Sequence, residues 1–153
     1  MTLIYRPCVG IVLINAHNHV FIGERIDHPG AWQMPQGGVD EGEDMTTAFF
    51  RELREETGTD NATILGVYPT PIRYDFPPHK IPLLYNGRYA GQEQTWIAAR
   101  FDGDDSELHL DGHNPPEFNA WRWVDPDELL TIIVPWKRPT YEAVFNYFRP
   151  HLR

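Results

Sequence analysis

Three closely spaced glutamates, Glu52, Glu55 and Glu56, are the residues of this 153-residue chain whose type and spacing most suggest chemistry. Carboxylate oxygens are ligands that Mg²⁺ prefers, and an ion held this way keeps coordination positions for water and for substrate phosphates. The same residues also fit a solvated helix face on which Arg51 and Glu55 form an ordinary ion pair. The glutamates alone do not decide between a metal site and a polar surface.

A helix is predicted to present the three acids together. Neither Pro nor Gly occurs within residues 43–57 and helix formers are frequent, so we expect a helix over residues 44–57. Gly58 follows, at a position where a left-handed residue ends many helices. Positions i, i+3 and i+4 share one helix face, which would hold the carboxylates, and Phe49 and Leu53 would form an apolar edge beside it.

The sequence before this helix favours the metal site. Gly37 is followed by five residues and then Glu43, and seven further residues lead to the run RELREETG. This arrangement resembles the Nudix box, G-x5-E-x7-R-E-U-x-E-E-x-G-U, in which U is a bulky aliphatic residue. All seven fixed letters are present: Gly37, Glu43, Arg51, Glu52, Glu55, Glu56 and Gly58. The one departure is Thr59 at the last aliphatic position, which we expect to affect packing and not the ligands.

The resemblance implies a hydrolase of phosphoanhydride bonds that works with Mg²⁺, or alternatively with Mn²⁺. Cations of this kind neutralise the phosphate oxygens and lower the pKa of bound water. The implied metal ligands are the carboxylates of Glu52, Glu55, Glu56 and Glu117 and the backbone carbonyl of Gly37. The four carboxylates are also the implied catalytic groups. Glu117 is added because Pro116-Glu117-Phe118 matches a segment that supplements the metal site in the family. Either Glu56 or Glu117 would accept the proton of the attacking water.

The remaining box residues are expected to be structural. Arg51 would hold the carboxylates in orientation without touching substrate. Glu43 lies away from the face with three acids, and Gly58 would serve as the helix cap. We therefore assign all three to the framework of the site.

Four further motifs narrow the resemblance. They are YRP at residues 5–7, WQMPQGG at 32–38, YDFPP at 74–78 and GQEQTW at 91–96. Together they resemble the bacterial RNA pyrophosphohydrolases and the related dinucleoside polyphosphate hydrolases of bacteria and plants. The implied reaction is removal of pyrophosphate from the 5′-triphosphate end of RNA, with a role in mRNA decay, or asymmetric cleavage of a dinucleoside polyphosphate. These motifs do not separate the two substrates.

Two alternatives remain, the first within the same class of function and the second from another class. One is a hydrolase that removes another nucleoside diphosphate derivative, for which the box would be identical. The other is a Nudix-fold module that senses a nucleotide without cleaving it. Loss of a box glutamate would mark such a module, and the presence of all of them disfavours it.

Contacts to the rest of the substrate are expected from two kinds of side chain. Arg6 and Lys137, with Arg25 as a weaker candidate, supply local positive charge for a polyphosphate chain. Tyr74 and Phe76 are two aromatic residues on a proline-bounded segment. They fit either a stacking platform for a base or the hydrophobic core, and the sequence leaves both open.

Composition sets outer limits on partners and compartment. The formal net charge is 13 − 22 = −9, so no overall basic field attracts nucleic acid. The length and the 41% hydrophobic content fit one domain over residues 1–153. Cys8 is the single cysteine, no stretch is long enough to span a membrane, and residues 1–7 lack a signal-peptide pattern, so we expect a cytoplasmic protein. The sequence identifies no protein partner.

The predicted elements combine into an α/β fold. A short helix should begin at Asp125, and the last helix, over residues 136–147, should bury Tyr141, Val144, Phe145 and Phe148. Strands are expected at residues 8–15, 20–25, 62–68, 91–101, 107–110 and 115–124, with another strand ending near residue 76. Helices on both sides of these strands would give an α/β/α sandwich with a mixed sheet. The resemblance implies the same architecture, the Nudix fold.

Overall fold

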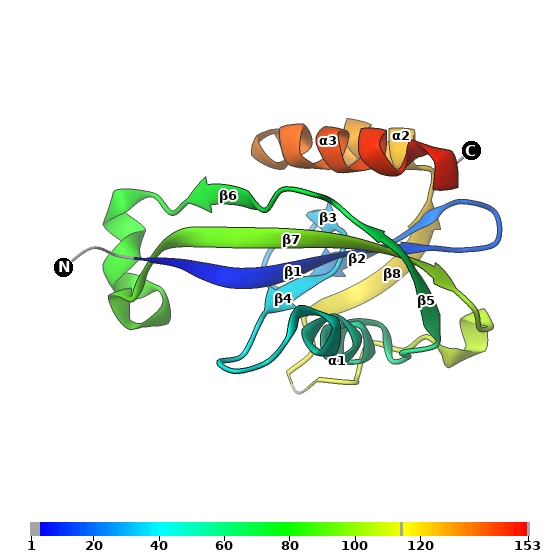
Figure 1. Cartoon of the computed structure of the whole chain (residues 1–153), viewed down its shortest axis with the longest axis horizontal. Coiled ribbons are helices and arrows are strands. Elements are labelled where there is room, and N and C mark those ends of the chain that lie inside the picture. Colours follow the sequence, from blue (N-terminus) through cyan, green and yellow to red (C-terminus); the bar gives the residue numbers. More distant parts are fainter. Residues whose placement is uncertain (1–3, 114, 153) are drawn as a thin grey trace.

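The computed structural model describes residues 4–113 and 115–152, and it contains one mixed sheet between helices. Helix α1 (Met45–Thr57) covers one face of the sheet, and α2 (Pro126–Ile132) and α3 (Arg138–Phe148) cover the other (Figure 1). The predicted α/β/α sandwich is confirmed. No helix in the described part of the chain is long and apolar enough to cross a membrane.

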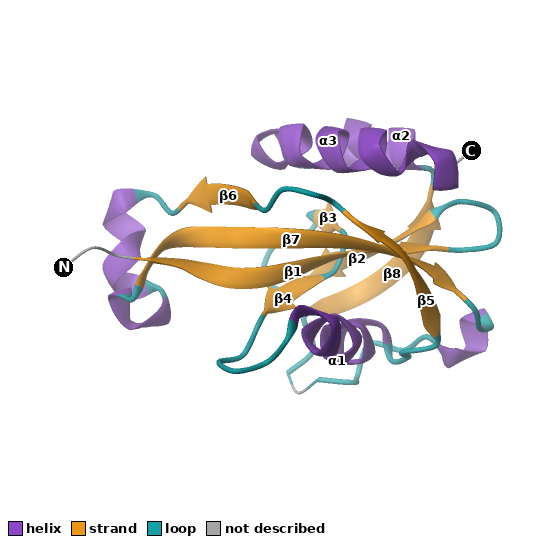
Figure 2. Ribbon diagram, viewed as in Figure 1, coloured by secondary structure: helices purple, strands orange, loops and turns teal. Residues whose placement is uncertain are grey.

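The sheet is built around two long parallel strands, β1 and β7, which lie side by side in its centre (Figure 2). All other strand pairs are antiparallel. The path is β3-β2-β1-β7-β5, while β4 pairs with β1, β6 with β7 and β8 with β2. The strands are β1 (Ile4–Ile14), β2 (Val20–Arg25), β3 (Trp32–Gln33), β4 (Gln36–Gly38), β5 (Ala62–Val67), β6 (Ile72–Asp75), β7 (Tyr89–Phe101) and β8 (Phe118–Val124).

Strand β1 is apolar on both sides because both faces of the sheet are covered. Every residue from Cys8 to Ile14 is buried, as predicted from the continuous apolar run. Val9, Ile11 and Leu13 join the cluster under α1. Val12 and Ile14 join the cluster under α3, since successive side chains of a strand point to opposite faces.

Helix α1 begins and ends where its sequence predicts. The Asp44 side chain accepts a hydrogen bond from the Thr47 N–H (2.8 Å), which caps the first turn. Gly58 has a φ of +86° and donates its N–H to the Arg54 carbonyl (2.9 Å), so it is the predicted left-handed cap. These two caps fix the length of the helix and therefore the positions of the acids along it.

The predicted strand at residues 107–110 is wrong. Residues Asp105–Glu107 form a 3-10 turn capped by Asp104, whose N–H is accepted in return by the Glu107 carboxylate (3.0 Å). The His109 N–H then donates to the Thr57 carbonyl at the end of α1, not to a neighbouring strand. The alternation of polar and apolar residues here follows a loop that packs against a helix end.

Thr59 also has a specific place in this loop. It is buried, and its hydroxyl donates to the Glu107 carboxylate (3.1 Å). An aliphatic residue at this position would remove that hydrogen bond. The polar departure from the box pattern is therefore matched by a polar partner, and it lies away from the acids of α1.

The apolar face of α3 provides a direct test of the packing. Phe145 is fully buried in the cluster beneath α3, whereas Tyr147, on the same helix, is half exposed. We expect Phe145→Ala to lower the free energy of unfolding by about 3–5 kcal/mol, because it removes buried area and leaves a cavity. Tyr147→Ala is the control and should cost no more than about 1 kcal/mol. Urea denaturation measures both, and equal losses would contradict this packing.

Candidate active site

A cleft of about 950 Å³ lies where β1, β4, β6 and β7 meet the acids of α1 and the 3-10 turn Pro135–Lys137, which precedes α3. Nearly all residues singled out from the sequence line it: Arg6, Arg25, Gly37, Arg51, Glu52, Glu55, Glu56, Tyr74, Phe76, Glu117 and Lys137. Glu43 and Gly58 are not part of its described lining, whereas Arg51, which was also predicted to be structural, is. Arg138 is also outside and pairs with Glu142 on the surface of α3.

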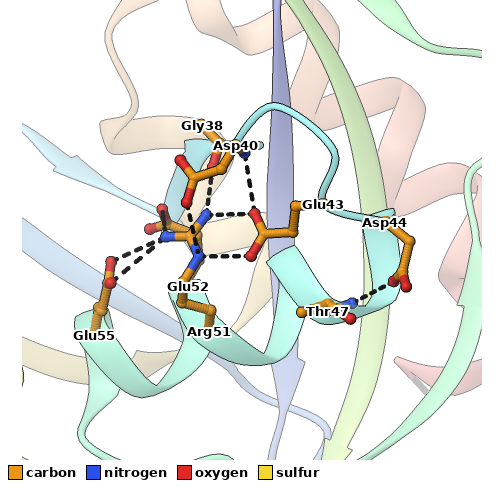
Figure 3. A network of polar contacts seen from close by, with 8 residues as sticks. All are labelled: Gly38, Asp40, Glu43, Asp44, Thr47, Arg51, Glu52 and Glu55. Carbon is orange, nitrogen blue, oxygen red and sulfur yellow. Dashed lines mark hydrogen bonds and ion pairs between the residues drawn. The ribbon is translucent and has the colours of Figure 1, made fainter.

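Arg51 is the centre of a polar network that ties the loop after β4 to helix α1 (Figure 3). Its guanidinium donates two hydrogen bonds to Glu43, one to the Gly38 carbonyl and one to Glu52, each of 2.8 Å. The Glu55 carboxylate lies further away, at 3.4 Å. Arg51 therefore fixes the positions of two glutamates on the cleft side while using Glu43 as its main counter-charge.

Glu43 closes the loop that precedes α1. One of its oxygens accepts the Asp40 N–H (3.0 Å) and both accept from Arg51. The hydrogen bonds from Arg51 and from the Asp40 backbone hold the pKa of Glu43 at about 2, well below its usual value. Glu43 thus stays ionised at neutral pH and anchors the arginine.

Two adjacent glycines allow charged side chains to lie directly on the backbone of β4. A Cβ atom at Gly37 would stand 2.0 Å from the carboxyl carbon of Glu52. A Cβ atom at Gly38 would stand 2.1 Å from a guanidinium nitrogen of Arg6. Any side chain at these positions would displace the carboxylate or the guanidinium, which explains the glycine pair on physical grounds.

Glu56 is the most unusual carboxylate of the site. Its side chain is buried, and no hydrogen bond to it is found within residues 4–113 and 115–152. Burial, followed by the negative charges of Glu117, Glu52 and Glu55, raises its pKa to about 9. Burial also raises the pKa of Glu52, against the effect of its hydrogen bond from Arg51. The ionised form of Glu56 needs positive charge, and no described side chain donates a hydrogen bond to it.

A divalent cation fits this need, because hard cations bind carboxylate oxygens and compensate their charge. The four acids nevertheless are not gathered at a single point. Among the residues that the structure describes, no three His, Cys, Asp or Glu side chains are grouped closely enough to hold a metal ion. Mutual repulsion of like charges and the hydrogen bonds from Arg51 to Glu52 and Glu55 account for this spread.

Apart from Arg51, the cationic side chains that line the cleft form no ion pair with the acids of α1 among the described residues. The Arg6 guanidinium stacks on the Tyr85 ring (4.4 Å to its centre) and donates to the Tyr85 hydroxyl (3.2 Å). The Lys137 ammonium donates to the Gln33 amide oxygen (2.5 Å), and burial lowers the pKa of Lys137 to about 8. Arg25 has Asp27 as a two-point partner (2.6 and 2.9 Å).

The two aromatic residues proposed as a platform differ in exposure. Phe76 is 7% exposed and stacks on the Tyr85 ring, so it is mainly a packing residue. Tyr74 is partly buried, and its ring lies 5.2 Å from that of Trp136, which is 58% exposed. The open aromatic surface of the cleft therefore includes Tyr74, Trp136 and Tyr85, which is 42% exposed, and sequence reasoning singled out neither Tyr85 nor Trp136. The only signal for Trp136 was the neighbouring Lys137.

Sequence reasoning also missed the uncharged polar residues and one histidine of the cleft. The missed lining residues include Gln33, Gln36, Gln92 and His113. The three glutamines occur in the motifs WQMPQGG and GQEQTW. These motifs contributed to the family resemblance, but no role was predicted for their individual side chains. His113 donates its Nδ1–H to the Pro115 carbonyl (2.8 Å), a contact that no local pattern predicts.

The raised pKa of Glu56 predicts how the metal-free protein responds to pH. Between about pH 4.5 and pH 9 the unfolded chain has lost the proton that folded Glu56 keeps, so the free energy of unfolding falls as pH rises. Glu56→Gln has no proton to lose. We expect its free energy of unfolding to gain about 1 kcal/mol or more on the parent between pH 5 and pH 8.

Chemical denaturation in the presence of a chelator measures this difference. Glu41→Gln, at an exposed loop position, is the matched control and should follow the parent at every pH. If Glu56→Gln also runs parallel to the parent, the Glu56 carboxyl is not protonated in the folded metal-free protein.

Comparison with known proteins agrees with the fold and the box. Residues 4–144 match the NUDIX domain family. The chain is 53% identical to the RNA pyrophosphohydrolase of Rhodospirillum rubrum over 92% of this chain and 84% of that protein. It is 51% identical to the RNA pyrophosphohydrolase of Erythrobacter litoralis over 95% of this chain and 91% of that protein.

Solved structures support the same fold at lower identity. The Escherichia coli dihydroneopterin triphosphate pyrophosphohydrolase matches 91% of this chain and 95% of its own, with a TM-score of 0.68 and 19% identity. The Caenorhabditis elegans Ap4A hydrolase, solved as a binary complex, matches 95% of this chain and 98% of its own, with a TM-score of 0.69 and 18% identity. The family match covers nearly the whole chain and includes the complete box, so the chain belongs to the Nudix family and is a Nudix pyrophosphohydrolase.

Proposed function

We propose that this protein removes pyrophosphate from the 5′-triphosphate end of RNA, with a divalent cation as cofactor. The observation that carries the proposal is the placement of buried, uncompensated carboxylates at one end of a cleft whose other walls hold cations and aromatic rings. The substrate is suggested by the curated relatives, which are named RNA pyrophosphohydrolase and are 44–53% identical to the chain over 92–99% of its length. The expected role is mRNA decay.

In this proposal Glu52, Glu55, Glu56 and Glu117 hold the cation, together with the Gly37 carbonyl. Mg²⁺ is the proposed ion and Mn²⁺ the alternative, because every ligand is an oxygen atom. When bound, the ion supplies positive charge to the phosphoryl oxygens and acidifies water. Arg51 keeps Glu52 and Glu55 in orientation through hydrogen bonds from its guanidinium.

The attacking water must lose a proton, and two carboxylates are positioned to accept it. Glu56 is buried near the C-terminal end of helix α1, and Glu117 lies on the exposed loop before β8. Its loop is held to the rim of the cleft by a hydrogen bond from the Ile26 N–H to the Glu117 carbonyl (3.1 Å). The proposal keeps both residues as candidates for the base, and removal of either should lower kcat by about 100-fold or more.

The other walls of the cleft bind the rest of the substrate. Arg6 and Lys137 are proposed to contact the phosphate chain, since both line the cleft and neither pairs with a carboxylate among the described residues. Arg25 is less available because Asp27 neutralises it. Tyr74 is proposed to contact the first base, and Phe76 to support the rim from below.

A dinucleoside polyphosphate offers the same phosphoanhydride bond and a base at each end. The motifs YDFPP and GQEQTW resemble hydrolases of that substrate as well, so it is the second candidate. We also propose that residues 1–153 form one catalytic domain. The proposed location is the cytoplasm, where RNA is found and the free thiol of Cys8 remains reduced. No protein partner is proposed.

The substrate assignment predicts a ratio of specificity constants. With Mg²⁺, kcat/KM for a short 5′-triphosphorylated RNA should exceed that for diadenosine tetraphosphate. Glu56→Gln should lose at least about 100-fold on both, because both share one catalytic centre. A higher value on the dinucleotide would reverse the order of the two candidates. Retention of near-parental activity by Glu56→Gln would remove the assignment of the catalytic acids.

The role of Lys137 predicts a pH effect on substrate binding. The ammonium is charged below its pKa of about 8 and neutral above it, so KM for the triphosphorylated RNA should rise between pH 7 and pH 9. Lys137→Arg keeps its charge and should show a smaller rise, while Lys137→Met should have a high KM at both pH values. Initial rates at saturating metal measure this, and identical pH profiles in all three proteins would contradict a contact from Lys137.

A further inference from the structure

A hydrogen-bonded relay of three glutamines connects a buried tryptophan to the floor of the cleft. The Trp96 indole N–H donates to the Gln94 amide oxygen (3.1 Å). The Gln94 amide nitrogen donates to the oxygen of Gln36 (2.8 Å) and to that of Gln92 (3.3 Å). Trp96, Gln94 and Gln92 are buried, and Gln36 and Gln92 line the cleft.

The direction of this relay follows from the tryptophan. An indole N–H can only donate, so the Gln94 group that faces Trp96 must be its oxygen. The Gln94 nitrogen then faces the other two glutamines, and each of them must present its oxygen to it. Consequently both remaining amide nitrogens, of Gln36 and Gln92, point away from Gln94, and neither makes a hydrogen bond within the described residues.

Packing holds the tryptophan that sets this direction. A Cβ atom at Gly10 would stand 2.4 Å from the Trp96 ring, so the indole lies directly on the backbone of β1. The Tyr141 ring contacts it edge-on, with ring centres 5.6 Å apart. Tyr141 is itself fixed, because its hydroxyl accepts the Met34 N–H (3.0 Å). The donor at the start of the relay therefore has a single orientation.

The two outer amides lie at the end of the cleft suited to phosphate. Gln36 precedes Gly37, against which the Glu52 carboxylate rests. Gln92 is the register partner of Arg6 on the adjacent strand β1. The Gln36 side chain points to the face of the sheet opposite Gly37 and Glu52, the face on which Gln92 and Arg6 lie. Amide N–H groups are uncharged donors, so they can bind phosphoryl oxygens beside Arg6 without forming an ion pair that competes with the cation.

We propose that Trp96 and Gln94 are positioning residues: they hold Gln36 and Gln92 with amide N–H groups facing the cleft, where these donate to phosphoryl oxygens of the substrate. This inference deepens the proposed function and rests on it. Phosphoryl oxygens only accept hydrogen bonds, so an amide turned the other way would repel the substrate. The orientation of two side chains thus becomes part of substrate binding.

The isosteric variant Gln94→Glu tests the orientation. A carboxylate still accepts from Trp96, but it has no hydrogen to donate, so Gln36 and Gln92 must turn their nitrogens inward and their oxygens into the cleft. We expect KM for the 5′-triphosphorylated RNA to rise about tenfold or more, with kcat within about threefold of the parent. An unchanged KM would overturn the proposal.

The added charge of the glutamate requires a matched background. In a protein that carries Gln36→Met and Gln92→Met, Gln94→Glu should change KM by less than about twofold, because the groups through which it acts are gone. If the rise is the same in this background as in the parent, buried charge alone causes it and the relay has no role in binding.

The neutral variant Gln94→Met covers the case in which Gln94→Glu does not fold. It removes the constraint without adding charge, and we expect KM to rise about threefold with kcat retained; an unchanged KM overturns the proposal. The parent protein separates this inference from the proposed function. If the parent cleaves neither the triphosphorylated RNA nor diadenosine tetraphosphate, both fall together. If the parent is active and the variants have the same KM as the parent, only the proposed role of the glutamine relay is contradicted.

Discussion

Burial of negative charge is the constraint on which the rest of this structure depends. Glu52 and Glu56 are each only 6% exposed, and Glu56 faces other acids with no described hydrogen bond. Charge in such a place is costly unless it is compensated. Arg51 lies beside the acids and compensates part of this charge, and in the proposed function a bound divalent cation compensates the rest.

The surrounding elements can be understood as supports for this arrangement. Asp44 and Gly58 fix both ends of helix α1, and Glu43 holds Arg51 against the loop from β4. Arg6 and Lys137, the cations proposed for the substrate, form no ion pair with the acids of α1 within residues 4–113 and 115–152. The neutral amides of Gln36 and Gln92 share the side of the sheet with Arg6, and their direction is set through Gln94. An overall charge of −9 is compatible with a polyanionic substrate because these local groups outweigh the net field.

Local physical chemistry explains which features were predictable from the sequence. Helix formers, a capping aspartate and a glycine mark α1, and apolar periodicity marks the buried face of α3, so both helices were predicted correctly. The prediction of a strand at residues 107–110 was wrong because it used only the local alternation of polar and apolar residues. The loop is instead fixed by the hydrogen bond from His109 to Thr57, which are 52 residues apart in the sequence. The family resemblance added Glu117 and Arg6, which composition and periodicity alone would not have identified.

The residues that escaped prediction depend on contacts between distant segments. Gln36 and Gln94 are 58 positions apart, and neither carries a charge or a metal-ligating group that would draw attention. The sequence does not distinguish Trp136 from any other aromatic residue, because its exposure and its contact with Tyr74 are known only from the structure. Likewise, whether Phe76 packs or stacks is a matter of burial, which its sequence context does not determine.

The most direct test of the central claim is the affinity of the protein for Mn²⁺ as a function of pH, followed by electron paramagnetic resonance of the free ion. If the cation compensates the charge of Glu56, binding must displace the proton that the buried carboxyl holds below about pH 9. The affinity should therefore increase from pH 6 to pH 9 in the parent and change much less in Glu56→Gln. An affinity independent of pH, or equal in the two proteins, would contradict this account of the site.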